Sequence, residues 1–205
     1  MTSKKRPTTR PGKEGLSEEQ DGTRFEFHPV TADRLQDLER FSLAHGTFRY
    51  CSCMRWRMPS TEYKASTKES RIAALEGLVR KGTPVGVLAY AGGEPVGWCS
   101  IAPRETYAAL ERFRALPRLD NAAVWSVVCF FVDSRFRDKG LTLGLLKAAV
   151  KYARSLGAKI IEGYPVKPDE KLYKYMGAPS TFQEAGFRDV TPAHLTRKIV
   201  RQRDE

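Results

Sequence analysis

The segment Ala123–Tyr164 constrains the fold most, because its pattern changes from strand to helix and back to strand. It begins with an almost unbroken apolar run, Val124–Val132, of the kind found in strands that are buried on both faces. From Leu141 the apolar side chains recur with helical spacing as far as Gly157, where a left-handed helix cap is expected. Residues 160–161 open a second strand. The order strand, helix, strand predicts a parallel βαβ crossover, which is nearly always right-handed.

A basic turn joins the first of these strands to the helix, and it reads RDKGLT over residues 137–142. A helix start presents free backbone N–H groups and the positive end of the helix dipole. Gly140 lets the backbone approach a ligand closely, and Arg137 and Lys139 add positive charge. The turn is therefore expected to bind a phosphate or pyrophosphate group. Neither the P-loop pattern nor the dinucleotide-binding glycine pattern is present.

The turn resembles the acetyl-CoA signature R/Q-x-x-G-x-G/A of the GCN5-related N-acetyltransferase (GNAT) family, with Thr142 at the last small position. Cys129–Asp133 is similar to the family's fourth strand, and Phe182–Phe187 resembles its late Y-x-x-x-G-F segment. The resemblance extends from Arg24 to Arg201, and it implies acetyl-CoA as the acetyl donor and no metal. The implied cofactor-binding residues are Phe130, Phe131, Val132, Arg137, Asp138, Lys139, Gly140, Leu141 and Thr142.

The remaining chain predicts antiparallel strands before the βαβ unit, so the fold class is α/β with a mixed sheet. We expect a mostly antiparallel twisted sheet of about six to seven strands with helices on both faces. The resemblance adds a splayed pair of parallel strands, as in the GNAT fold. The other predicted strands are 24–29, 84–91, 94–102 and 195–201, and the other predicted helices are 31–44 and 70–80.

The domain organisation follows from length and composition. Residues 1–22 are mostly polar or charged and contain a single Leu, so we expect a disordered basic tail. Residues 23–203 are expected to form a single acyl-CoA N-acyltransferase (GNAT) domain, a normal size for one domain.

The resemblance implies direct attack of a primary amine on the thioester, in a ternary complex and without an acyl-enzyme. A carboxylate, or water held by one, can take the proton of the amine, and Glu162 is the first choice, followed by Glu105. The family's usual acid, a tyrosine, is replaced by Phe182, which cannot donate a proton. Tyr173, Tyr175 or water then protonates the leaving thiolate. A backbone N–H of the first βαβ strand would stabilise the oxyanion.

The segment Thr47–Tyr63 is dense in aromatic, Arg, Met and Cys residues. We interpret it as a packed or flexible loop over the acceptor side, in which Tyr50, Arg55 and Trp56 shape an acceptor pocket. The alternative is an aromatic core with arginines that extend to the surface. The C-x-C spacing of residues 51 and 53 lacks the second ligand pair of a zinc site, and a catalytic thiol there has no obvious base.

Composition limits the partners and the compartment. The 205 residues carry a net charge of +11, four scattered cysteines and no apolar run of membrane-spanning length. These features favour a reducing, cytoplasmic location without a membrane partner. The basic balance mildly disfavours polycationic acceptors, and nucleic acid is the less favoured partner because no recognised module or long basic block is present. A homodimer is compatible with the resemblance.

Two alternatives to a small-molecule or protein N-acetyltransferase stay open. The first is a non-catalytic acyl-CoA-binding regulatory module, which the phenylalanine at position 182 suggests. The second is an RNA-directed acetyltransferase, which the net charge suggests.

Overall fold

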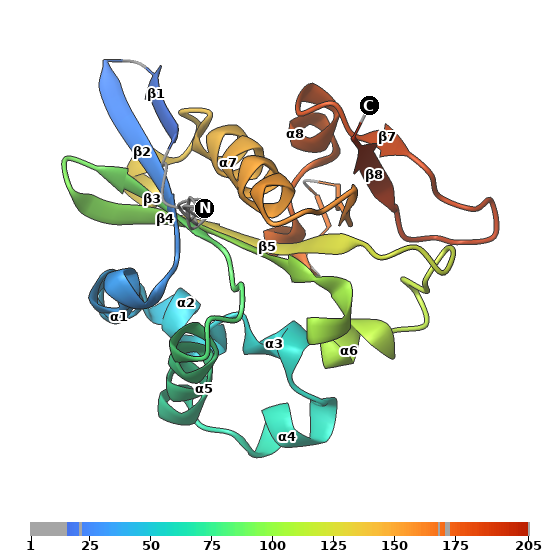
Figure 1. The fold of residues 1–205 in the computed structure, drawn as a ribbon, viewed down its shortest axis with the longest axis horizontal. Coiled ribbons are helices and arrows are strands. Elements are labelled where there is room, and N and C mark those ends of the chain that lie inside the picture. Colours follow the sequence, from blue (N-terminus) through green and yellow to red (C-terminus); the bar gives the residue numbers. More distant parts are fainter. Residues whose placement is uncertain (1–15, 21, 168, 171–172, 205) are drawn as a thin grey trace, which may run out of the picture.

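The computed structural model describes residues 16–20, 22–167, 169–170 and 173–204 (Figure 1). Within these residues the strands form one sheet of eight, in the order β1-β2-β3-β4-β5-β6-β8-β7. Neighbouring strands are antiparallel except for the parallel pair β5–β6, so the predicted mixed, mostly antiparallel sheet is confirmed. The strands are β1 (Leu16–Gln20), β2 (Thr23–Pro29), β3 (Val87–Ala91), β4 (Glu94–Pro103), β5 (Trp125–Val132), β6 (Ile160–Gly163), β7 (Arg188–Asp189) and β8 (Val200–Arg203).

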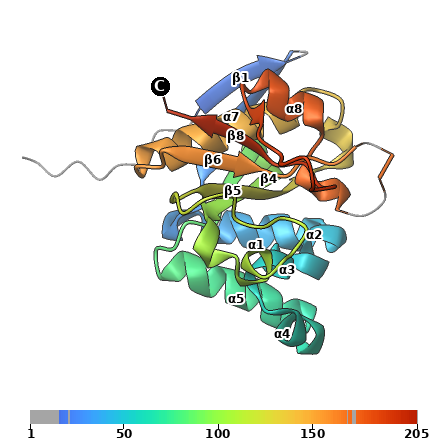
Figure 2. The same cartoon turned by 90° about the vertical axis from the view of Figure 1, so that its right-hand side faces the viewer.

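Helices cover both faces of the sheet, as predicted. Helices α7 and α8 lie on one face, and α1 to α6 lie on the other (Figures 1 and 2). The helices are α1 (Leu35–Ala44), α2 (Gly46–Cys51), α3 (Met54–Arg57), α4 (Ser60–Ala65), α5 (Lys68–Arg80), α6 (Ala108–Glu111), α7 (Leu141–Ser155) and α8 (Pro179–Glu184). Short 3-10 turns are η1 (Ala32–Arg34), η2 (Arg104–Thr106), η3 (Ser134–Phe136) and η4 (Lys174–Met176).

Strand β1 corrects the prediction that the first 22 residues are a tail. It pairs antiparallel with β2, from Leu16 opposite Phe27 to Gln20 opposite Thr23. The turn between the strands contains Gly22 at φ 72°, a conformation that glycine adopts easily. The segment buries little and is held by backbone pairing at a strand edge, which composition does not reveal. Residues 1–15 of the predicted tail lie outside the described residues.

The segment Thr47–Tyr63, expected as a loop, instead forms α2, α3 and the start of α4. Phe48, Met54 and Trp56 are buried there, as in the aromatic-core alternative. The buried Arg71 of α5 holds the segment in place, because its guanidinium donates to the backbone carbonyl oxygens of Tyr50 and Tyr63, near the two ends of the segment. The break between α2 and α3 falls at residues 52–53, which have φ values of 46° and 50°. Neither is Gly or Asn, so the sequence carries no usual signal for this break.

The parallel strands β5 and β6 separate soon after they pair. Their register runs only from Trp125 opposite Ile161 to Val127 opposite Gly163, whereas β5 continues to Val132. A bulge lies where they part, because on the β4 side Ser100 faces Cys129 and Ile101 faces Val127, which leaves the residue between them unpaired. Within the described residues, the second half of β5 therefore has an edge without a strand partner on the β6 side.

Candidate active site

The turn after β5 leads to the start of α7, where the first backbone N–H groups of the helix have no intrahelical partner. Gly140 is the residue before the helix and has φ 66°, and Asp138 has φ 60°. The backbone oxygen of Gly140 accepts from the N–H groups of Leu143 and Gly144, at 2.9 and 3.2 Å. The earlier N–H groups of the helix thus lie ahead of its first hydrogen-bonded turn, where an anion would meet them and the positive helix dipole.

Asp133 and Arg135 fix the preceding turn η3. The Asp133 carboxylate accepts from the Arg135 backbone N–H at 2.9 Å and from its guanidinium at 2.7 Å. These bonds to Arg135 lower the pKa of the Asp133 carboxyl. Arg135 is thereby occupied by a local partner, whereas Arg137, two residues later, lines the cavities next to the turn.

Two adjoining cavities, of about 350 and about 430 Å³, lie between β5, the turn and α8. Both are lined by Val132, Arg137, Thr142 and Thr181. Of the residues predicted to bind the cofactor, those that line at least one of the cavities are Phe130, Phe131, Val132, Arg137, Asp138, Gly140, Leu141 and Thr142. Lys139 lies apart, with its Nζ 5.8 Å from the ring centre of Phe136.

Sequence reasoning missed the wall that α8 supplies. Thr181 lines both cavities, and Ala178 and Glu184 each line one. Nothing local in the sequence indicates that α8 faces the turn at residues 137–142. That placement depends on long-range packing of α8 against α7 on the same face of the sheet.

The two candidate tyrosines lie in different places. Tyr175, on η4, lines the cavity next to Phe130 and Phe131 and is 40% exposed. Tyr173 instead packs in an aromatic cluster, with ring centres 5.6 Å from Trp56 and 5.7 Å from Phe113. Of these two tyrosines, only Tyr175 reaches the cavities.

Phe182 is a core residue at the position where the family often has tyrosine. It is fully buried, and its ring centre lies 6.0 Å from Phe130 and 5.1 Å from Phe187. A Cβ atom on Gly163 would lie 2.2 Å from the Phe182 ring. Phe182 therefore packs against the last residue of β6, at the point where the parallel strands part.

Glu162 lies in a buried charge network. Its Oε1 accepts from Arg104 Nη1 and from the Tyr164 hydroxyl, each at 2.6 Å, and its Oε2 accepts from Arg201 Nε at 2.7 Å. The Glu162 side chain is 0% exposed. Burial, and then the negative charge of Glu162, raise the pKa of the Tyr164 hydroxyl. Glu162 lines neither cavity, and Glu105, the second choice, is an exposed residue of η2.

The predicted acceptor residues line neither of these two cavities. Trp56 is 5% exposed and belongs to the cluster with Tyr173. The Arg55 guanidinium lies 5.7 Å from the Trp56 ring centre. Tyr50 is 57% exposed on α2 and stacks under Arg71 of α5.

Of the two nearby cysteines, Cys53 is buried and Cys51 is partly exposed. Cys53 is 2% exposed and accepts a hydrogen bond from Trp98 Nε1 at 3.0 Å. Burial, and then Cys53, raise the pKa of the Cys51 thiol. Among the described residues, no group of three or more His, Cys, Asp or Glu side chains is arranged to hold a metal ion.

A match to a protein family model identifies the family of this chain. The model of the acetyltransferase (GNAT) family matches residues 50–178, more than half of the chain. The chain belongs to the GNAT family. Membership supports acetyl-CoA-dependent N-acetyltransferase activity in general, and the matched part contains β5, the turn and α7.

Solved GNAT structures share the fold. A GNAT-family acetyltransferase from Listeria monocytogenes has a TM-score of 0.57 and 11% identity, over 92% of this chain and 100% of that one. Mycobacterium smegmatis RimJ, in complex with CoA-disulfide, has a TM-score of 0.54 and 14% identity, over 92% and 86%. No curated protein sequence matches the chain. In the described part of this GNAT protein, no helix has the length and apolar character needed to cross a membrane.

Proposed function

We propose that this GNAT protein transfers an acetyl group from acetyl-CoA to a primary amine by direct attack in a ternary complex. One observation carries the proposal: the edge of β5 that has no strand partner among the described residues is followed, after η3, by a glycine turn at the start of α7, and both line the same adjoining cavities. An extended pantetheine chain can pair with such an edge as another strand would. A pyrophosphate is suited to the turn at its end.

Different groups of the turn and of β5 would bind different parts of acetyl-CoA. Backbone N–H groups near Gly140 and Thr142 would hold the pyrophosphate, and Arg137 would add a charge-assisted hydrogen bond. Phe130 and Val132 would flank the pantetheine. A backbone N–H next to the β5 bulge, near Cys129, would stabilise the oxyanion as the amine nitrogen attacks the thioester carbon.

The proton transfers complete the reaction. As the C–N bond forms, the C–S bond breaks and leaves the CoA thiolate, which takes a proton. We assign that proton to the Tyr175 hydroxyl or to water beside it, because Tyr175 lines the cavity next to β5. The amine gives its proton to water and not to Glu162, since both oxygens of Glu162 already accept hydrogen bonds in a buried network.

Calorimetric titration with acetyl-CoA tests the binding part of the proposal. The double variant Arg137→Ala, Gly140→Ala removes one cation and strains the turn, because alanine is unfavourable at φ 66°. Affinity should fall by about tenfold or more, since a hydrogen bond to a charged group contributes about 1.5–3 kcal/mol. Lys147→Ala is the matched control, an exposed cation on the same helix, and it should bind as the wild type does. Unchanged affinity of the double variant would overturn the assignment.

A second candidate is a regulatory module that binds acyl-CoA without catalysis. The buried Phe182 favours it, because the family's usual tyrosine proton donor is absent from that position. The two functions differ in turnover. Release of free thiol from acetyl-CoA in the presence of a broad set of amines supports the transferase, and tight binding without release supports the module.

A further inference from the structure

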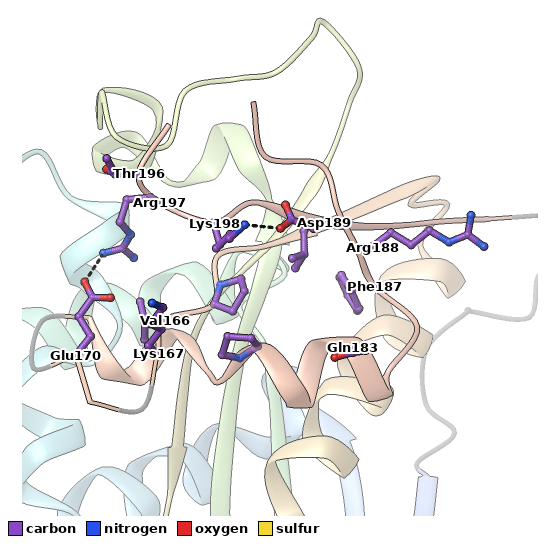
Figure 3. Close-up of a pocket in the computed structure, with 13 residues that line it drawn as sticks. Val166, Lys167, Glu170, Gln183, Phe187, Arg188, Asp189, Thr196, Arg197 and Lys198 are labelled. Atoms are coloured by element: carbon purple, nitrogen blue, oxygen red, sulfur yellow. Dashed lines mark hydrogen bonds and ion pairs between the residues drawn. The ribbon is translucent and has the colours of Figure 1, made fainter. Parts of the chain in front are cut away.

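A third cavity, of about 880 Å³, is drawn in Figure 3 and lies beside α8, on the side of that helix that does not face the candidate active site. Pro179 and Gln183 of α8 line this cavity, whereas Thr181 and Glu184 line those at the turn. It shares no lining residue with those two cavities. Its remaining walls come from the segment after β6, from β7 and the residue before it, from residues 196–198 and from the start of β8. The proposed transfer reaction gives this cavity no role.

The lining combines apolar and charged side chains. Val166, Phe187 and Val200 are 5%, 5% and 8% exposed, and two prolines lie beside them. The charged lining residues are Lys167, Arg188, Arg197 and Lys198, and Glu170 and Asp189. Each carboxylate forms an ion pair with one cation, Lys198 with Asp189 and Arg197 with Glu170. Arg188 points away from the other lining residues (Figure 3), so Lys167 leaves one positive charge in excess beside an apolar surface. Such a lining suits a ligand that is both anionic and apolar.

Lys198 and Asp189 neutralise each other. Lys198 Nζ lies 2.6 Å from Asp189 Oδ2, and Figure 3 shows the pair at one side of the cavity. The bond to Lys198, together with Thr191, lowers the pKa of the Asp189 carboxyl to about 2. This pair therefore offers little free charge to a ligand.

Among the described residues, Arg197 has a looser carboxylate partner, Glu170 (Figure 3). Its side chain is 11% exposed, yet its Nε is buried with no hydrogen-bond partner among the residues that the structure describes. Its Nη2 donates to the Met176 thioether at 3.4 Å, which is a weak acceptor. Its Nη1 lies 3.7 Å from Glu170 Oε1, too far for a hydrogen bond. The guanidinium lies 4.6 Å from the Tyr173 ring centre, and this contact supplies no oxygen.

A guanidinium that is mostly buried and poorly paired costs free energy unless an acceptor satisfies it. A carboxylate matches it best, because two oxygens fit the fork of N–H groups. We propose that this cavity binds a small organic acid, with its carboxylate on Arg197 and its apolar body against Val166, Phe187 and Val200. An inorganic anion would leave the apolar wall uncovered, and a neutral ligand would leave Arg197 with only the longer Glu170 contact.

Calorimetry and thermal unfolding with three acids of increasing length test the site: phenylacetate, 3-phenylpropionate and 4-phenylbutyrate. The full chain is used without acetyl-CoA, so the result does not depend on the proposed transfer reaction. At least one acid should bind with a dissociation constant below about 10 mM and raise Tm, and its uncharged amide should not. Arg197→Met should weaken that binding about tenfold or more. Arg188→Met, whose side chain points away from the other lining residues in Figure 3, should bind within about twofold of the wild type.

The stability of ligand-free Arg197→Met separates a binding role from a structural one. Methionine keeps much of the side-chain volume and removes the poorly paired charge, so its Tm should equal or exceed that of the wild type. A Tm several degrees lower would show that Arg197 supports the fold, and it would overturn the proposal. No binding of any of the three acids by the wild type, or unchanged binding by Arg197→Met, would also overturn it.

Discussion

At the scale of single residues, Glu162 accepts three hydrogen bonds in a site with no solvent exposure. Glu162→Gln should destabilise the protein by about 3–5 kcal/mol, because it leaves Arg104 and Arg201 without their shared buried anion. Urea unfolding measures this loss. Glu105→Gln, at an exposed carboxylate, should change the stability by less than about 0.5 kcal/mol. A Glu162→Gln variant of native stability that has lost its turnover would restore Glu162 as the general base.

Phe182 leads to a second prediction at this scale. Phe182→Tyr restores the residue that the family often has, but it places a hydroxyl in a fully buried site against Gly163 and Phe130. The variant should lose about 1–3 kcal/mol of stability and gain no turnover, since the new hydroxyl has no partner in that packing. Thermal unfolding and thiol release are the two measurements. A clear rise in turnover would show that the hydroxyl reaches the sulfur of the cofactor.

At the scale of secondary-structure elements, β1 can be tested by truncation. Deleting residues 1–20 removes the strand that pairs along β2, whereas deleting residues 1–15 leaves it in place. The longer deletion should be less stable than the shorter one by about 1–3 kcal/mol, the value of a few backbone hydrogen bonds. Both variants should bind acetyl-CoA equally, because β1 contributes no residue to the cavities beside the turn. Equal unfolding midpoints in urea would contradict the prediction.

At the scale of the whole molecule, paired carboxylates govern the response to acid. Arg201 lowers the pKa of Asp120, Arg135 that of Asp133, and Lys198 that of Asp189, the last to about 2. Each folded-state pKa lies below the unfolded value of about 3.9, so these pairs stabilise the fold above about pH 4. Their contribution is lost as the pH falls toward about 2.

Urea unfolding from about pH 7 to about pH 2.5 should show this decline. Asp189→Asn should flatten it, because the variant no longer takes up a proton at this position on unfolding. Glu39→Gln, on the exposed side of α1, is the comparison variant. If the unfolding free energy of Asp189→Asn depends on pH as steeply as that of the wild type, Asp189 does not contribute to the acid response.

The sequence predicts the parts of the fold that short-range patterns determine. The turn at residues 137–142 and the βαβ unit follow from local periodicity and one glycine, and eight of the nine predicted cofactor residues line the cavities. Long-range packing determines the rest. Thr181 reaches the site only because α8 lies across from the turn, and Glu162 is enclosed only because Arg201 returns on β8. Nothing near either residue in the sequence indicates those neighbours.

Gly144 lies where α7 packs against strands β1 and β2. A Cβ atom there would lie 2.5 Å from the Phe27 ring of β2 and 3.1 Å from the Glu18 carboxylate of β1. A larger side chain at 144 would thus have to arise together with a smaller one at 27, or with a shift of the whole helix. Among descendants of this sequence, residues 144 and 27 should covary. A change in the position of the start of α7 should accompany a change in the position of the β1–β2 hairpin.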